Sequence, residues 1–157
     1  MNGAHPVQDQ HSFFVQATHD HACLHQTVEA IHQLLEATQD AAINYQAVQA
    51  VTAAIVDLQR DLREHFERGE QGGYHEEVVT LVLELVPQAN QLQKQHAELL
   101  RLAEEMVADA QCGDQPVDVW NRLKTDYTRF AKQLLAHESA ENCLLERVFN
   151  EDLGGDV

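Results

Sequence analysis

The sequence predicts an all-α protein, folded as an up-down-up-down four-helix bundle. Glycine (7) and proline (3) are scarce among the 157 residues, and this composition favours helix. Turn-forming segments divide the chain into four stretches, and in each stretch apolar residues recur at alternating steps of three and four, the pattern of a bundle seam. We expect one domain over 12–150, a flexible N-terminus over 1–11 and an irregular C-terminal tail over 151–157.

The expected helices span 12–38, 41–70, 75–111 and 115–149. The first should end near Thr38 and the second near Gln71, just before the pair Gly72-Gly73. Pro87 lies inside the third, so we expect this helix to be interrupted there, with a short piece from Tyr74 and a longer piece after the proline. The segment QCGDQP separates the third helix from the fourth.

Each predicted seam is apolar except for one histidine, and only one charged residue lies on any seam. The first three seams are Phe14, Ala17, His21, Leu24, Val28, Ile31 and Leu35; Val48, Val51, Ile55, Leu58, Leu62, His65 and Gly69; and Leu85, Ala89, Leu92, His96, Leu99, Ala103, Met106 and Ala110. The fourth is Trp120, Leu123, Tyr127, Phe130, Leu134, His137, Glu141, Leu144 and Val148.

Charge and composition exclude several classes of function. A net charge of -16 leaves no basic surface for nucleic acid or for an anionic membrane. No signal-peptide pattern begins the chain, and the three cysteines, Cys23, Cys112 and Cys143, lack the spacing of a metal motif. These features favour a cytoplasmic protein. A monomer is expected, because each seam can be covered within one chain.

The four seam histidines should meet. In helices that alternate in direction, His21, His65, His96 and His137 come near the same end of the bundle, within about two helical turns of one another. A single buried histidine is ordinarily a hydrogen-bonded core residue. Four that converge would each need a separate partner, and the seams offer few polar groups. A shared metal site therefore explains the pattern better.

Glu141 adds a carboxylate to this set. It follows His137 by four residues, so both side chains can reach one inward point. Imidazole nitrogen with carboxylate oxygen suits non-haem iron or manganese, whereas structural zinc sites more often use cysteine. An exposed helical pair is the ordinary alternative for this spacing, and the seam position argues against it.

Four motifs in order resemble the hemerythrin-like (HHE) family: DHACL at Asp20–Leu24, HFERGE at His65–Glu70, QHAELL at Gln95–Leu100 and HESAENCLL at His137–Leu145. The resemblance covers nearly the whole chain. It implies an up-down four-helix bundle around a non-haem diiron centre that is bridged by carboxylates and binds dioxygen or related small ligands. The residues that match the family's metal ligands are His21, His65, His96, His137 and Glu141.

Two positions depart from the family's pattern. A second carboxylate usually follows the second-helix histidine by four residues, and this chain has Gly69 there. Oxygen-carrying hemerythrins have a further histidine where this chain has Leu100, so the resemblance is to the broader family. Glu70 can replace the missing carboxylate if the helix unwinds near Gly69; otherwise water or another side chain completes the site. His25 is either an additional ligand or a flank residue.

The expected function is a non-haem diiron protein that binds, senses or reacts with O2, peroxide or nitric oxide. The predicted metal ligands are His21, His65, Glu70, His96, His137 and Glu141. The cofactor is two iron ions or one, with zinc or manganese as alternatives. The alternative functions are iron or zinc handling without oxygen chemistry, and a metal-free helical interaction module.

Overall fold

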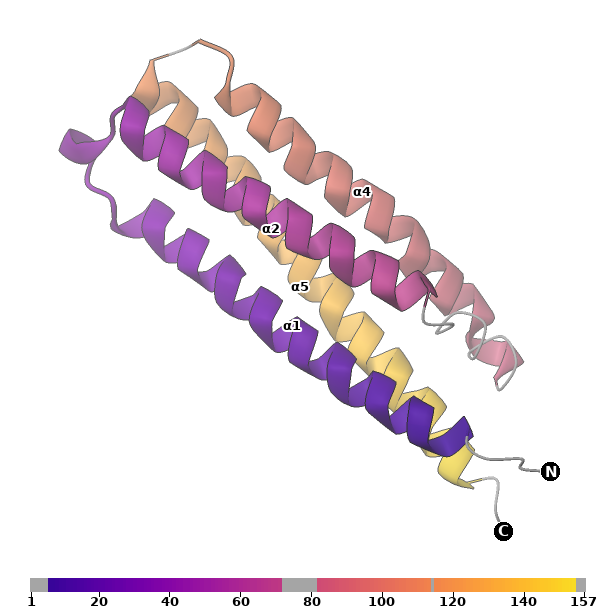
Figure 1. Cartoon of the computed structure of the whole chain (residues 1–157). Helices are drawn as coiled ribbons and strands as arrows, with labels where there is room; N and C mark the ends of the chain where they lie inside the picture. The colour runs from indigo at the N-terminus through magenta and orange to yellow at the C-terminus, as the bar shows by residue number, and fades with distance from the viewer. Residues whose placement is uncertain (1–5, 72–81, 114, 155–157) are drawn as a thin grey trace.

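The computed structural model describes residues 6–71, 82–113 and 115–154, and side chains within 15–70, 82–113 and 115–150. Four long helices pack against one another (Figure 1). They are α1 (Pro6–Ala37), α2 (Tyr45–Gln71), α4 (Val86–Ala110) and α5 (Pro116–Gly154). Two short 3-10 turns, η1 (Asp40–Ala42) and η2 (Leu83–Leu85), precede α2 and α4. The described residues contain no strand, which confirms the all-α prediction and the packing of four helices.

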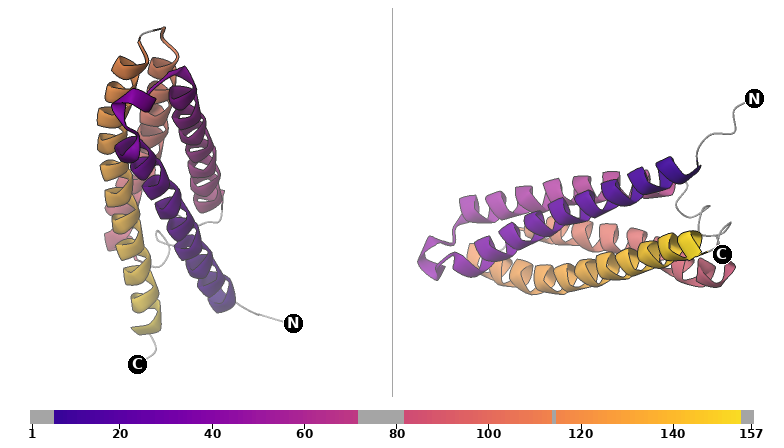
Figure 2. Two further views of the ribbon diagram at one scale, coloured as in Figure 1. Left: turned by 90° about the vertical axis from the view of Figure 1, so that its left-hand side faces the viewer. Right: turned by 90° about the horizontal axis from the view of Figure 1, so that it is seen from below.

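The helices form a ring of four neighbours. Helix α1 packs against α2 and α5, and α4 packs against the same two helices from the other side, whereas α2 and α5 touch each other less (Figure 2). The start of α1 and the end of α5 lie at one end of the bundle, and η1 lies at the other (Figure 1). A residue on the inward face of each helix can therefore meet counterparts from its two neighbours.

Helix ends agree with the prediction at two of the breaks and differ at the chain's extremities. Helix α1 ends at Ala37 and α2 at Gln71, as expected. However, α1 begins at Pro6, within the segment expected to be flexible, and α5 continues to Gly154, through half of the expected tail. Proline is well suited to the first helical position. No glycine or proline lies between Pro116 and Gly154, so nothing in this segment ends the helix earlier.

Pro87 lies in the first turn of α4, directly after η2. A proline at this place removes no helical hydrogen bond, because the first N–H groups of a helix have no partner within it. The longer piece expected after Pro87 is present as α4. The short piece expected from Tyr74 falls in residues that are outside those described.

The core consists of two apolar clusters with a polar layer between them. On α4, His96 lies between Leu92 of the smaller cluster and Leu99 of the larger one. On α5, the stretch that holds His137 and Glu141 likewise lies between Leu134 of the larger cluster and Leu144 of the smaller. The predicted seams supply nearly all of the core, and most of their side chains are buried. The half-buried seam residues are Gly69, His96, Ala110 and Val148, and the side chain of Phe14 is outside those described.

Each helix is amphipathic rather than uniformly apolar. Across residues 6–71, 82–113 and 115–154, no helix combines the length and the hydrophobicity needed to cross a bilayer.

Tyr127 anchors α5 to α1 inside the larger cluster. Its hydroxyl donates to the Val28 carbonyl at 2.8 Å, and its side chain is fully buried. Tyr127→Phe should therefore lower the free energy of unfolding by about 1 kcal/mol, the usual net contribution of one buried hydrogen bond. Urea denaturation followed by circular dichroism measures this. Tyr45→Phe is the control, because Tyr45 is exposed; equal effects of the two changes would contradict the assignment.

Candidate metal centre

Five of the predicted ligands lie together in the polar layer. His21 comes from α1, His65 from α2, His96 from α4, and His137 and Glu141 from α5. Four of them are at most 8% exposed, and the His96 side chain is 13% exposed. The sequence prediction that the four seam histidines meet is therefore confirmed by the geometry.

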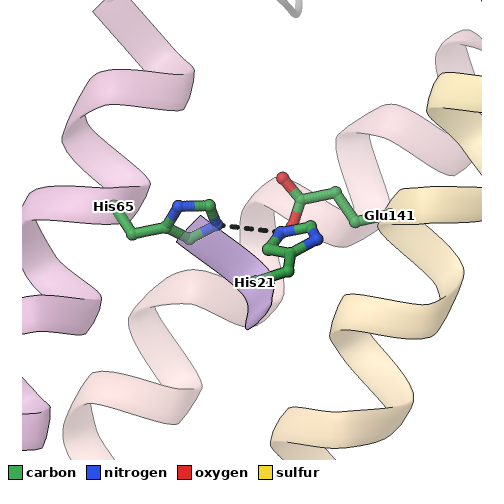
Figure 3. A group of neighbouring side chains, drawn as sticks. All are labelled: His21, His65 and Glu141. Atoms are coloured by element: carbon green, nitrogen blue, oxygen red, sulfur yellow. Dashed lines mark hydrogen bonds and ion pairs between the residues drawn. The ribbon is translucent and has the colours of Figure 1, made fainter. Parts of the chain in front are cut away.

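Their potential ligand atoms form two groups of three that share one carboxylate. His21 and His65 make one group with Glu141, and His96 and His137 make the other group with the same residue; within each group the ligand atoms lie within 4.8 Å of one another. Figure 3 shows the first group, in which one nitrogen of each imidazole points toward the other ring and the Glu141 carboxylate lies beside them. Oε2 of Glu141 is 3.2 Å from Nε2 of His137 and 3.6 Å from Nε2 of His21. This carboxylate is placed to bridge.

The outer nitrogen, Nδ1, of each histidine faces an oxygen that can accept a hydrogen bond. The four pairs are His21 with Oδ1 of Asn142 at 2.7 Å, His65 with Oδ2 of Asp20 at 3.5 Å, His96 with Oε1 of Glu70 at 3.2 Å, and His137 with Oε1 of Gln95 at 2.8 Å. Carboxylate and amide oxygens only accept, so this network assigns the proton of each neutral imidazole to Nδ1. Nε2 then keeps its lone pair.

These oxygen partners form a closed ring around the bundle. Asp20 of α1 supports the histidine of α2, and Glu70 of α2 supports the histidine of α4. Gln95 of α4 supports the histidine of α5, and Asn142 of α5 supports the histidine of α1. Every helix thus orients the histidine of the next helix, and the ring fixes the rotation of all four imidazoles. Such outer hydrogen bonds are what set the ring orientation and basicity of metal-binding histidines.

The inward nitrogens of His21 and His65 are so close that a proton or a cation must lie between them. Nε2 of His21 lies 3.0 Å from Nε2 of His65, and the ring centroids are 4.8 Å apart. If both Nδ1 atoms carry protons, two lone pairs face each other across this contact. A proton or a metal cation at this point removes the repulsion. The geometry of the pair therefore suits a bound cation.

The pKa shifts agree with this arrangement. Burial lowers the pKa of His65 and of His96, which favours the neutral, metal-binding form. Burial also acts to lower the pKa of His21, but the neighbouring Glu141 carboxylate outweighs burial and leaves that pKa raised. Burial acts to raise the pKa of Glu141, yet His137 and His21 hold it well below its usual range. Glu141 is therefore an anion in this site.

Two features of these residues suit a metal ion: buried atoms that lack a hydrogen-bond partner, and the chemical type of the potential ligands. Nε2 of His96, Nε2 of His137 and Oε2 of Glu141 are buried without a hydrogen-bond partner. Burying such atoms unpaired is costly, and a metal ion would satisfy all three. Imidazole nitrogen with one bridging carboxylate matches the preferences of iron, and those of manganese or zinc as alternatives.

Glu70 is the predicted ligand that the structure does not bring into either group. Helix α2 remains helical through Gly69 to Gln71, so the unwinding that would turn Glu70 inward is absent. Five residues after His65, the side chain leaves the seam by about 140°. Its carboxylate is 44% exposed and faces the outer nitrogen of His96. As placed, Glu70 orients a ligand rather than serving as one.

His25 is exposed on α1 and belongs to neither group. Of the two alternatives that the sequence leaves open, the structure favours the one in which His25 lies on the flank of its helix and is not an additional ligand.

Sequence reasoning missed four polar residues around the site. Asp20, Gln95 and Asn142 each adjoin a ligand of their own helix in sequence but bond to the histidine of a neighbouring helix. Glu138 follows His137 outside the predicted seam, but it is 6% exposed, and its Oε1 has no partner. Burial raises the pKa of Glu138 to about 7, with an opposing influence from His21 and a further increase from Glu141.

Phe66 closes one side of the site. Its ring stacks on His96 with centroids 3.9 Å apart and an interplanar angle of 7°, and it meets the edge of His137 at 5.6 Å. This residue is buried at 4% exposure. Its contacts hold two imidazoles in place.

Comparisons with models of protein families, with curated proteins and with solved structures give no match to this chain. The resemblance to hemerythrin-like proteins therefore depends on the four sequence motifs alone and stays a prediction.

Glu138 should make the stability of the metal-free protein fall with pH. The raised pKa means that, between about pH 4.5 and 7, the folded protein binds a proton that the unfolded chain has lost. The free energy of unfolding should then decrease over this window by up to about 3 kcal/mol. At higher pH this contribution should stay at its lower value. Urea denaturation at several pH values, with chelator present, measures the slope.

Glu138→Gln should remove that contribution, so the difference in stability between wild type and variant should change over the same window. Glu146→Gln, an exposed change on the same helix, is the control. Parallel pH profiles for wild type and Glu138→Gln would contradict the raised pKa.

Proposed function

We propose that this protein binds two metal ions, one in each group of ligands, with Glu141 bridging them. The observation that carries the proposal is the convergence of four imidazoles whose outer nitrogens bond to oxygen and whose inner nitrogens face a shared carboxylate. A core histidine needs only one such bond. Four arranged alike, with three buried atoms still unpaired, support a site built for cations.

Iron is the metal we propose, and the ligand of the loaded site would be O2, peroxide or nitric oxide. Iron in a nitrogen-and-carboxylate site supplies redox chemistry and an open coordination position for such small ligands. The chain's own contribution is to orient the four imidazoles, to favour the neutral form of His65 and His96, to keep Glu141 ionised, and to surround the site with Phe66 and the buried leucines nearby. These roles accord with the hemerythrin-like resemblance.

The finer topology and localisation belong to the same proposal. An up-down-up-down arrangement, as in hemerythrin-like proteins, is supported by the position of η1 opposite the start of α1 and the end of α5. A cytoplasmic location and a monomeric state accord with the unpaired cysteines, which are all exposed, and with the strongly acidic composition.

Metal handling without oxygen chemistry is the second candidate. It is favoured by the single carboxylate shared between the two groups, because few anionic ligands make at least one metal easier to release. Rapid loss of iron to a chelator, with no reaction of the loaded protein towards O2, peroxide or nitric oxide, would favour this candidate. A metal-free interaction module predicts instead that His96→Leu stabilises the protein, since it removes an unpaired buried nitrogen.

Metal stoichiometry tests the proposal. Protein reconstituted with Fe(II) should bind about two ions per chain, one for each group. His96→Ala should remove about one ion, because this residue belongs to one group only. Glu141→Ala should impair both, because both groups use this carboxylate. Elemental analysis after desalting, with circular dichroism to verify folding, gives the answer.

His25→Ala is the matched control for the histidine variants, since His25 is exposed and lies outside both groups. Absence of bound metal in the wild-type protein would overturn the proposed function. Loss of only one ion in Glu141→Ala would show that this carboxylate is not shared.

A further inference from the structure

Gly69 leaves an opening on the inward side of α2. Because the helix is regular here, position 69 lies on the same face as His65, four residues before it. A Cβ atom added at Gly69 would meet nothing within 4 Å. The space that a side chain would fill at this position is therefore present but empty of protein atoms.

This opening leads to the ligands themselves. A small cavity of about 20 Å³ is lined by Gly69 together with His65, His96 and Glu141, and by Ala89 on α4. Glu70 also lines it, and the carboxylate of Glu70 faces Nδ1 of His96 at 3.2 Å. It is large enough for about one water-sized group. Two of the three buried unpaired atoms, Nε2 of His96 and Oε2 of Glu141, belong to residues that line it.

The charge of the site calls for an anion. The histidines are neutral when they bind metal, and Glu141 is the single carboxylate shared by the two groups. This set carries far less negative charge than two divalent cations, and buried charge needs a partner. The other buried carboxylate among the described residues, Glu138, belongs to neither group.

We propose that the cavity at Gly69 binds a small exogenous monoanion of formate size, which completes the metal centre in place of a carboxylate side chain. The cavity, which holds about one water-sized group, and the open space at the Cβ position of Gly69 together limit the ligand to about two or three heavy atoms. Its position between His65, His96 and Glu141 places the anion against both ligand groups. The inference rests on the proposed metal function and deepens it by naming a ligand class for the site.

The test uses Fe(II)-loaded full-length protein and formate as the probe, under anaerobic conditions. The rate at which iron passes to a coloured Fe(II) chelator is measured with and without formate, for wild type and two variants. Gly69→Glu supplies the carboxylate from the chain, and Gly69→Gln fills the same space without charge. Neither should clash on folding, because a Cβ at this position meets open space, and helical circular dichroism verifies the fold.

Formate should slow iron release from the wild type by about tenfold, since an added anionic ligand holds the metal. Gly69→Glu should release iron about as slowly without formate and should no longer respond to it. Gly69→Gln should no longer respond to formate, but it should release iron as fast as the wild type does without formate.

Three outcomes would overturn the inference. If wild type binds iron but formate changes nothing, or if Gly69→Glu still responds like wild type, the inference fails and the metal function stands. If wild type binds no metal, the proposed function fails and the inference fails with it.

Discussion

The fold depends on burying five ionisable groups in one layer between two apolar clusters. Unpaired, each of these groups would cost several kcal/mol of stability, and the apolar clusters on both sides provide no polar partner. The layer is tolerable only because each imidazole bonds to an oxygen on its outer side and faces Glu141 or another imidazole on its inner side. The helices must therefore be rotated and aligned to satisfy the layer, and this alignment determines the rest of the packing.

The ring of outer partners makes the four helices mutually dependent. Rotation of α1 would displace His21 and also withdraw Asp20 from His65 on α2. The same holds for each helix in turn, since each contributes both a ligand and a support for its neighbour's ligand. The oxygen partners of the four histidines differ in chemical type. Carboxylates face His65 and His96, whereas amides face His21 and His137, so each group of potential ligands combines one strongly polarised imidazole with one more weakly polarised.

The seams and their four histidines could be predicted from sequence because one periodic pattern determines which face of each helix is buried. Nearly every predicted seam side chain is buried, from Ala17 on α1 to Leu144 on α5. The residues whose oxygens face the histidines could not be predicted in the same way. Asp20 and Gln95 lie beside ligands in sequence but serve a different helix, so their role depends on helix rotation. The position of Glu70 could not be predicted either, because it depends on whether α2 unwinds at Gly69, and a glycine permits either state.

The ring also determines when the centre can exist during synthesis of the chain. His21 is made well before its carboxylate and amide partners, Glu141 and Asn142, and Asn142 follows it by 121 residues. A nascent chain that has completed α1, α2 and α4 still lacks both the bridging carboxylate and the support that closes the ring. Under the proposed function, neither group of ligands can therefore form before α5 has been made, because both groups need Glu141.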